Sequence, residues 1–453
     1  MEIVPFVHEG LGNSSYLVKL AGDDALLVDP DRTASRYLAA AEERGWRISA
    51  VLETHVHADF ITGAPELVAA TDATVFHSPT AGVHYQHRAA QPGESIGLAG
   101  AEIEVIASPG HSPEHVSYVL RTAGGAPPAL LSGGAMTAGG AARTDLVSLD
   151  MTEPLTRSTF RTLQRAFAHL PDETLLLPTH GGGSFCSSGT TGERTSTLGR
   201  ERETNPLLMH TEEEEFVRWF PTTFPAIPAY FSRMRPANTA GPRLRRDITM
   251  PRGLSPEEFR EAGRDGLVVD VRPVDEYSGG HIRGSLSDAF RPSYATWLGW
   301  LAPDGARLFF VLGDVALDAV IDESLLVGYE DFGGYLEGGV GAWKRAGLPL
   351  ATTPVLDADA THALIDHGAA VLDVREAWEY QSGHIAGAVN VPVGSLAANL
   401  ERVPRDRPVV AYCGMGERST SAASILEGAG FEDVSNLAGG MITWRQAGMP
   451  VRV

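Results

Sequence analysis

The stretches LVVDVRPVDEYSGGHIRGS (267–285) and AVLDVREAWEYQSGHIAGA (370–388) are two versions of one sequence, 103 residues apart. Their ends repeat as well, because YLEGGVGAWKRAGLP (335–349) matches NLAGGMITWRQAGMP (436–450). Two long copies indicate two small domains, not a solenoid of short repeats. Each copy opens with an apolar, β-branched run typical of a buried parallel strand, and helix-like stretches follow. The repeat therefore predicts two small α/β domains with parallel sheets.

Length and composition indicate a globular protein of several domains. The chain has 453 residues, which at roughly 150 per domain predicts about three domains. Hydrophobic residues make up 43% and charged residues 21%, which is ordinary for a folded protein. A formal net charge of −21 disfavours nucleic acid and anionic membranes as partners. The predicted domain boundaries are 1–250, 251–352 and 353–453.

The cysteine count and the N-terminus bear on the compartment. Cys186 and Cys413 are the only two cysteines, too few for a disulfide scaffold. The N-terminal segment MEIVPFVHEG (1–10) has no basic and apolar regions of a secretory signal. No window approaches the roughly 18 consecutive apolar residues of a membrane-spanning helix. These features predict a cytoplasmic protein.

Residues 1–190 differ from the repeats and carry clusters of histidine. Short apolar runs end in such clusters, which is where open α/β sheets place their chemistry. Two imidazoles and a carboxylate on one short loop, as in the first cluster, suit a metal site. Histidines that only cap strand ends are the alternative, but four clusters favour a metal-site layout. The clusters are THVHADF (54–60), PGHS (109–112), LLSGGAM (130–136) and LLPTHGGG (176–183).

The C-terminal repeat contains a loop suited to a reactive thiol. The strand-like run PVVAY (408–412) leads into Cys413, and a helix start follows the loop. Glycines let backbone N–H groups turn inward, and both the helix N-terminus and Arg418 favour a thiolate. A small buried core cysteine is the alternative. The other loop residues, which we expect to contact the substrate, are Gly414, Met415, Gly416 and Glu417.

With CGMGER (413–418) and LAGGMITW (437–444), the C-terminal repeat resembles a rhodanese (sulfurtransferase) domain. The resemblance implies that Cys413 accepts a sulfane sulfur as a persulfide and passes it to a thiol, with Arg418 supporting the step. It also implies thiosulfate and low-molecular-weight thiols and persulfides as partners. The middle repeat has Leu312 opposite Cys413 and Leu317 opposite Arg418. That repeat resembles an inactive rhodanese domain.

The N-terminal part resembles the metallo-β-lactamase superfamily, an αβ/βα sandwich, and within it the persulfide dioxygenases. Segments such as ARTDL (142–146) and HGGGSFCSSG (180–189) carry the closer likeness. Those enzymes use ferrous iron and dioxygen to oxidise low-molecular-weight persulfides to sulfite. Fusions of such a domain to an inactive and then an active rhodanese are a known architecture. The resemblance covers nearly the whole chain.

Two departures from the family pattern affect the metal site. Phe60 stands where the superfamily has a further histidine, and Gly134 stands where the iron-binding aspartate is expected. Non-haem oxygenases hold iron with two histidines and one carboxylate, so this set is incomplete. The histidines that remain suit zinc at least as well as iron, and a water or a carboxylate could complete the shell. The candidate ligands are His55, His57 and His111, with Asp59 and His180 as remnants of a second site.

Three functions remain open from the sequence. The first is a Cys413 sulfurtransferase whose N-terminal domain binds persulfide or thiol. The second is an active iron persulfide dioxygenase fused to a rhodanese, and the third is a non-enzymatic sulfur carrier or sensor. A metallo-hydrolase is weaker, because Phe60 and Gly134 remove ligands from a binuclear centre. Cys186 follows a glycine loop and is predicted to line the N-terminal pocket, with a buried core position as the alternative; a homo-oligomer is compatible with all three.

Overall fold

Two six-stranded sheets form the N-terminal part of the protein in the computed structural model, which describes residues 1–123, 125–188 and 192–453. The strand orders are β1-β2-β3-β4-β5-β6 and β14-β12-β10-β9-β8-β7. The first sheet contains β1 (Ile3–His8), β2 (Asn13–Lys19), β3 (Asp24–Val28), β4 (Arg47–Leu52), β5 (Thr74–His77) and β6 (Arg88–Ala89). The second contains β7 (Ser95–Leu98), β8 (Ala101–Ala107), β9 (Val116–Thr122), β10 (Ala129–Gly133), β12 (Leu175–Pro178) and β14 (Ser196–Thr197).

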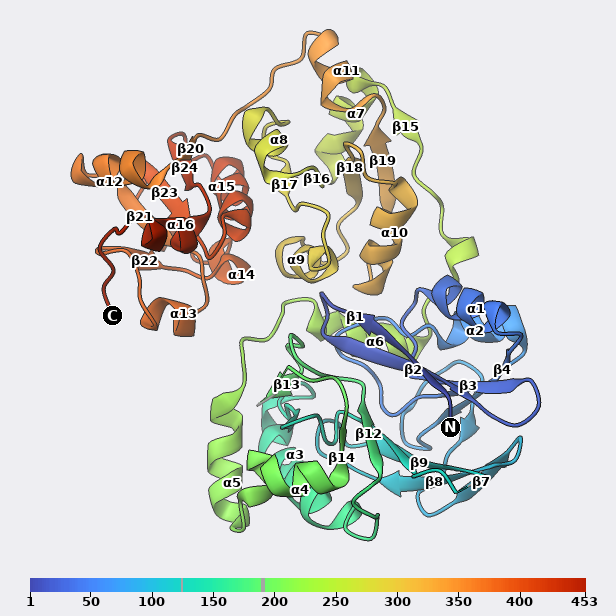
Figure 1. The fold of residues 1–453 in the computed structure, drawn as a ribbon. Coiled ribbons are helices and arrows are strands. Elements are labelled where there is room, and N and C mark those ends of the chain that lie inside the picture. The colour runs from blue at the N-terminus through green and yellow to red at the C-terminus, as the bar shows by residue number, and fades with distance from the viewer. Residues whose placement is uncertain (124, 189–191) are drawn as a thin grey trace. The chain divides into compact units, whose positions relative to one another are not determined.

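Apolar side chains between the two sheets form the central core of this part. Residues from both sheets share one buried cluster, among them Tyr16, Leu26, Ile103 and Tyr118. In β8 the buried positions alternate along the strand, as a sheet with one face on the core requires. The outer faces are covered by helices (Figure 1): α1 (Ala34–Glu43), α2 (Ala64–Thr71), α3 (Leu149–Arg161), α4 (Leu198–Thr204) and α5 (Glu213–Trp219). In α6 (Phe231–Ala240), Asn238 donates to the carbonyls of His57 and Phe60 and so holds the first histidine loop. The predicted αβ/βα sandwich is confirmed.

Each repeat contains one five-stranded sheet, and the two sheets have the same topology. Their orders are β15-β19-β18-β16-β17 and β20-β24-β23-β21-β22, with parallel pairing throughout. The predicted parallel sheets are confirmed. The strands are β15 (Gly253–Leu254), β16 (Leu267–Asp270), β17 (Leu286–Ser287), β18 (Leu308–Val311), β19 (Phe332–Leu336), β20 (Val355–Leu356), β21 (Ala370–Asp373), β22 (Val389–Asn390), β23 (Val409–Tyr412) and β24 (Val434–Leu437).

The helices of the two repeats follow the same succession along the chain (Figure 1). In the first repeat they are α7 (Pro256–Ala262), α8 (Val274–Gly279), α9 (Tyr294–Leu301), α10 (Leu317–Leu326) and α11 (Gly339–Arg345). In the second they are α12 (Ala358–Asp366), α13 (Ala377–Gln381), α14 (Val393–Leu396), α15 (Glu417–Gly428) and α16 (Gly440–Gln446). The last helix of each repeat buries one tryptophan, Trp343 or Trp444. The repeated sequence therefore encodes a repeated core.

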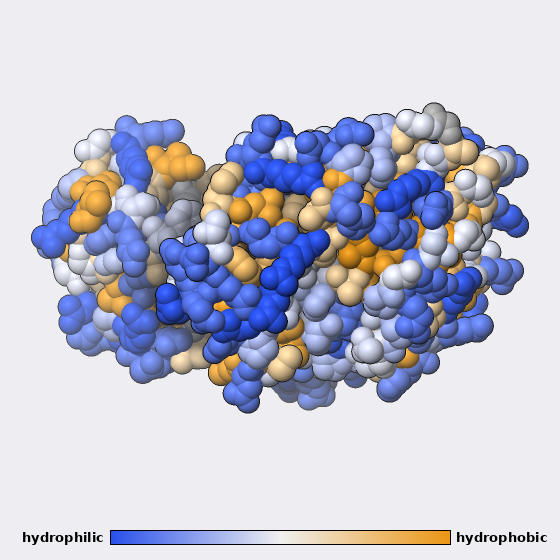
Figure 2. Space-filling view, turned by 90° about the horizontal axis from the view of Figure 1, so that it is seen from below, coloured by the Kyte–Doolittle hydropathy of each residue, from blue (hydrophilic) through white to orange (hydrophobic). Residues whose placement is uncertain are grey.

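The chain divides into two compact units. One holds Met1–Ile248 with Asp322–Gly328, and the other holds Thr249–Ile321 with Tyr329–Val453. Both parallel sheets thus belong to one unit, and the three boundaries drawn from the sequence stay a prediction. No helix among the described residues is long and apolar enough to cross a membrane. On the face shown in Figure 2, hydrophilic side chains predominate and hydrophobic ones form patches between them.

Candidate functional site

Cys413 lies where β23 ends, in a loop that closes on its sulfur. The N–H of Gly416 donates a hydrogen bond to Cys413 Sγ over 3.0 Å. Gly416 has a φ of 104°, a left-handed conformation that glycine adopts without strain, and α15 begins at the next residue. The loop N–H and the positive end of the helix both stabilise negative charge on the sulfur. This backbone geometry suits the thiolate that the sequence predicts at Cys413.

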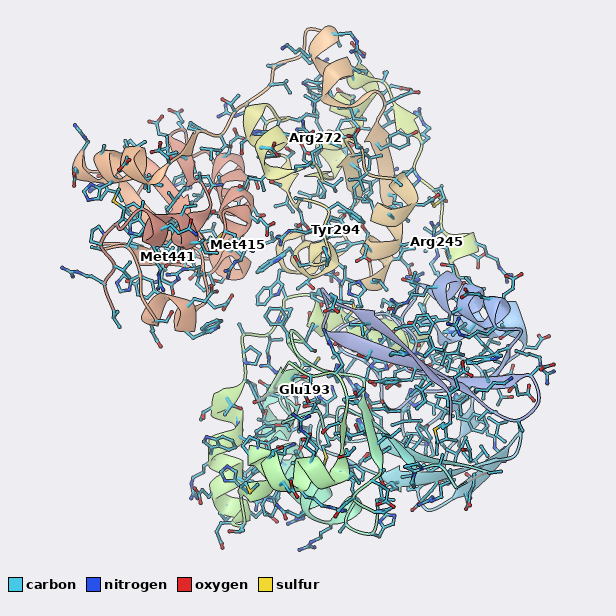
Figure 3. All side chains as sticks on the ribbon, viewed as in Figure 1. Glu193, Arg245, Arg272, Tyr294, Met415 and Met441 are labelled. Carbon is cyan, nitrogen blue, oxygen red and sulfur yellow. The ribbon has the colours of Figure 1, made fainter. Side chains whose placement is uncertain are left out.

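The glycine pair Gly439 and Gly440 allows the start of α16 to approach this loop. A Cβ on Gly440 would lie 2.4 Å from the carbonyl oxygen of Cys413, and its φ of 57° is left-handed. The N–H of Met441 donates to the same carbonyl over 2.8 Å. Figure 3 labels Met441, which is buried, and Met415, whose side chain is 63% exposed at the loop. The two glycines thus let α16 hold the loop in place through the Cys413 carbonyl, while Met415 stays exposed to solvent.

Two residues that the sequence did not single out order the loop. Asn436 donates through Nδ2 to the carbonyl of Gly416 over 3.0 Å. Ser419 Oγ lies 3.5 Å from Cys413 Sγ but only 2.6 Å from Asn436 Oδ1, so its single proton goes to the amide. Asn436 stands in the repeated NLAGG segment, which was the available signal for it. Both side chains position the loop, and the sulfur receives its hydrogen bond from the backbone.

Arg418 is held by a partner that the sequence analysis missed. Its guanidinium donates to both carboxylate oxygens of Glu379, over 2.7 and 2.9 Å. Burial opposes the charged form of Arg418, but these hydrogen bonds and the negative charge at Cys413 outweigh it and raise its pKa. Arg418 therefore stays charged next to the sulfur. Because Glu379 accepts two hydrogen bonds from the Arg418 guanidinium, only the remaining N–H groups of Arg418 are available to an anionic substrate.

Comparison of the two repeats separates structural from chemical residues. Arg375 pairs with Asp373 over 2.6 Å, and Arg272 (Figure 3) pairs with Asp270 over the same distance. Both arginines also donate to a glycine carbonyl eight residues further along the chain. Because the repeat without a loop cysteine keeps the pair, it serves the fold and not sulfur chemistry.

The first repeat also reaches the cysteine loop of the second. Arg291 Nη1 lies 2.6 Å from Glu417 Oε2. Asp288, fully buried beside Arg291, has a pKa raised well above its usual value because burial disfavours its charge. The ion pair of Arg291 is with Glu417. The charge of Glu417 at the loop is thus compensated by a side chain of the repeat that lacks the thiol.

The N-terminal candidates form a buried histidine cluster whose tautomers follow from their partners. His55 Nδ1 lies 2.8 Å from Thr54 Oγ1, whose proton is already given to Asp29. His111 Nδ1 lies 2.7 Å from the carbonyl of Arg143. His180 Nδ1 lies 3.1 Å from Asn13 Oδ1, since the amide nitrogen of Asn13 donates to Asp59. In all three rings Nδ1 is placed to donate, so Nε2 is the nitrogen that a neutral ring would offer to a metal ion.

The three rings lie close together in the cluster. The Nε2 atoms of His55 and His180 are 3.2 Å apart. The ring centroids of His111 lie 4.8 Å from His55 and 5.2 Å from His180. Nitrogens that share a tetrahedral zinc ion at about 2.1 Å are roughly 3.4 Å apart. The spacing of His55 and His180 therefore fits a shared cation. Ligand atoms of His57 also lie within 4.8 Å of those of His55 and His180, and those of His111 within 4.8 Å of those of His180 and Cys186.

His57 has carboxylate partners instead. Its Nε2 lies 3.2 Å from Glu53 and 3.4 Å from Asp29. Burial opposes its charged form, but Asp29 and Glu53 outweigh burial and raise its pKa to about 10. Phe60 stacks on the ring with centroids 4.2 Å apart. His57 Nδ1 has no hydrogen-bond partner among the described residues. The predicted metal-ligand set of His55, His57 and His111 stays a prediction.

The space at Gly134 is closed to the missing carboxylate. A Cβ there would lie 2.9 Å from both Ala142 Cβ and His111 Cδ2. His115 fills the neighbouring space: its Nε2 accepts from the N–H of Gly134 over 3.0 Å, and its Nδ1 lies 2.9 Å from Ser108 Oγ. Burial lowers the pKa of His115 to about 4. With both nitrogens engaged, His115 holds the turn in place; its position after His111 was the only sequence signal for it.

Asp59 and Cys186 also lie beside the histidine cluster. Asp59 Oδ2 lies 3.3 Å from His180 Nδ1, so that oxygen orients the ring from the side opposite its lone pair. Cys186 is fully buried and offers its sulfur within 4.8 Å of ligand nitrogens of His111 and His180. Burial and the nearby Asp59 charge raise the pKa of its thiol well above the usual value. The sequence left open whether Cys186 lines this pocket or is a buried core residue; the structure buries it completely, beside His111 and His180.

Comparison with known families agrees with the division of the chain into an N-terminal two-sheet part and two repeats. The Metallo-beta-lactamase superfamily matches residues 8–188, and the Rhodanese-like domain family matches residues 255–346 and 357–447. The chain is 39% identical over 87 residues to the thiosulfate sulfurtransferase GlpE of Pseudomonas savastanoi pv. phaseolicola, covering 82% of that protein and 19% of this chain. The chain therefore belongs to the rhodanese family, and it joins two rhodanese domains to a metallo-β-lactamase domain.

Further relatives share single parts or most of this arrangement. The HTH-type transcriptional regulator Rv0324 of Mycobacterium tuberculosis is 45% identical over 83 residues, but the chain spans only 36% of its length. A crystal structure of a metallo-beta-lactamase from Staphylococcus aureus subsp. aureus COL aligns with 74% of this chain and 98% of its own, at a TM-score of 0.65 and 27% identity. ETHE1 from Myxococcus xanthus aligns with 53% of this chain and 99% of its own, at a TM-score of 0.46 and 27% identity.

Proposed function

We propose that the chain is a sulfurtransferase that carries sulfane sulfur on Cys413. The observation behind this proposal is the hydrogen bond from the N–H of Gly416 to Cys413 Sγ over 3.0 Å, at the N-terminus of α15. Such a loop stabilises a thiolate and, after reaction, the anionic outer sulfur of a persulfide. Arg418 adds a positive charge that draws an anionic donor to the loop.

The transfer takes two displacement steps. The Cys413 thiolate attacks the outer sulfur of thiosulfate, the new S–S bond forms, and sulfite leaves with the electron pair of the broken bond. A low-molecular-weight thiolate then attacks the outer sulfur of the Cys413 persulfide. The acceptor leaves as a persulfide, and the Cys413 thiolate is regenerated. Thiosulfate as donor is supported by the likeness to a thiosulfate sulfurtransferase, and no external oxidant is needed.

The N-terminal domain fits a nitrogen-bound cation better than the iron of an oxygenase. The Nδ1 contacts of His55, His111 and His180 leave Nε2 of each ring for a zinc-type ion, which would supply a positive charge there. An iron site of two histidines and one carboxylate would need a carboxylate at position 134, where this chain has glycine. The neighbouring atoms leave no room for that side chain unless they move. The iron dioxygenase alternative therefore requires a ligand set different from that of the family it resembles.

Replacing Cys413 with Ser tests the proposal. Full-length Cys413→Ser should lose transfer of sulfur from thiosulfate to a thiol acceptor while keeping the circular-dichroism spectrum of the wild type. Cys186→Ser removes the other thiol and should keep the transfer. A Cys413→Ser protein that turns over like the wild type would sink the assignment. A persulfide that forms on Cys413 but is not passed to small thiols would favour the sulfur carrier or sensor.

A further inference from the structure

The charged side chains around the Cys413 loop pair with one another. Arg418 donates to both carboxylate oxygens of Glu379, over 2.7 and 2.9 Å. Arg291 pairs with Glu417 of the loop over 2.6 Å. Each of these two pairs is neutral as a whole. The negative charge that the sulfur of Cys413 carries as a thiolate or a persulfide is therefore not balanced by the net charge of either pair.

Glu376 brings a further carboxylate to the loop. It precedes α13, and its side chain accepts a hydrogen bond from the N–H of Glu379 as part of a capping box. Burial and the charge of Glu379 raise the pKa of Glu376, while the charge of Arg418 lowers it, and the net shift is upward. The negative charge of Glu376 is thus disfavoured where it lies. An additional positive charge at the loop would stabilise it.

The carboxylates are accessible where the sulfur is not. Cys413 is only 2% exposed, whereas Met415 of the same loop is 63% exposed. The side chains of Glu379 and Glu417 are 16% and 35% exposed. A thiol that reaches the sulfur therefore keeps the rest of its molecule at the accessible part of the loop, close to these carboxylates. The charge on that remainder acts directly on the rate of transfer.

We propose that the acceptor of the Cys413 persulfide is a thiol that carries a positive charge, of the aminothiol class, and that Glu376 is a specificity-determining residue for it. This inference rests on the proposed sulfurtransferase function. In the transfer step the acceptor thiolate attacks the outer sulfur of the persulfide and forms a new S–S bond. The bond to Cys413 breaks, and its sulfur leaves with the electron pair as a thiolate. A cationic group on the acceptor offsets the negative charge that gathers at the loop during this step.

Three thiols of the same length and different charge isolate this effect. Cysteamine, 2-mercaptoethanol and 3-mercaptopropionate end in an ammonium, a hydroxyl and a carboxylate. Full-length protein is loaded with sulfur from thiosulfate and freed of excess donor. The second-order rate constant for transfer to each thiol is then measured by rapid-quench alkylation and expressed per thiolate. Two unit charges about 7 Å apart in water interact by about one RT, so each step of the series should change the rate about threefold, with cysteamine fastest.

Variants assign the preference to the loop. Glu376→Gln keeps an oxygen that can accept the cap hydrogen bond, and it should lower the ratio of cysteamine to mercaptopropionate rates about threefold. Glu379→Gln, which frees the charge of Arg418, should lower the same ratio. Glu432→Gln is the matched control, because Glu432 is exposed and precedes β24, at the end of the parallel sheet opposite Cys413. In 1 M salt, where the Debye length is about 3 Å, the preference should nearly vanish.

Two kinds of result overturn the inference. Equal rates for the three thiols, or mercaptopropionate as the fastest, would show that the loop does not select a cation. A ratio that Glu376→Gln and Glu379→Gln both leave unchanged, or that Glu432→Gln lowers as much, would place the cause elsewhere. Since the ratio compares thiols within one protein, a variant that is only less stable does not change it. Loss of transfer to all three thiols would instead overturn the proposed function, so the two failures are distinguishable.

Discussion

Restoring the missing carboxylate at Gly134 should destabilise the N-terminal domain. A Cβ at this position would lie 2.9 Å from Ala142 Cβ and from His111 Cδ2, closer than real Cβ atoms approach. The turn cannot move away freely, because the N–H of Gly134 is bonded to His115 and its carbonyl accepts from Ala142. Overpacking of this kind costs about 1–3 kcal/mol. For a domain of this size each kcal/mol lowers Tm by roughly 2–4 °C, so we expect a decrease of about 2–12 °C.

Scanning calorimetry of the full-length Gly134→Asp protein measures this decrease. Gly97→Asp, in β7, is the matched control, because a Cβ there meets nothing within 4 Å among the described residues. Adding Ala142→Gly removes one of the two close contacts, so the double variant should lose less stability than the two single changes sum to. Gain of iron affinity, as the family pattern implies for this aspartate, should appear only with that extra room. An unchanged Tm in Gly134→Asp, or an equal loss in Gly97→Asp, would refute the steric argument.

Three changes near Cys413 follow from its neighbours. Arg418→Ala should lower kcat/KM for thiosulfate about tenfold without abolishing transfer, because the N–H of Gly416 remains; an unchanged rate would make Arg418 structural. Asn436→Ala should lower kcat because it removes the hydrogen bond to the Gly416 carbonyl. Unchanged turnover in that variant would show that the loop keeps its conformation without Asn436. Arg291→Ala should raise KM for thiosulfate by leaving Glu417 uncompensated, and adding Glu417→Gln should restore it; no rescue would rule out charge as the cause.

The sequence predicted what local patterns encode. The repeat predicted both parallel sheets because apolar, β-branched runs and glycine turns are local signals, and the Cys413 loop was found because all its residues are contiguous. Partners from distant segments were missed for the opposite reason. Glu379 meets Arg418 from 39 residues away, and nothing in the local sequence marks it as that partner. Similarly, His180 looked marginal beside His57 until the hydrogen bonds at its Nδ1 were visible, since a tautomer depends on tertiary contacts.

The most direct test of the central claim is to locate the sulfur on the protein after reaction with thiosulfate. The full-length wild type is treated with thiosulfate, freed of excess donor, alkylated to trap persulfides, and mapped by peptide mass spectrometry. We predict one added sulfur atom on the peptide that contains Cys413, its loss on addition of a thiol acceptor, and release of one sulfite per chain. A Cys413 peptide without added sulfur, alongside continued transfer by the protein, would contradict the account.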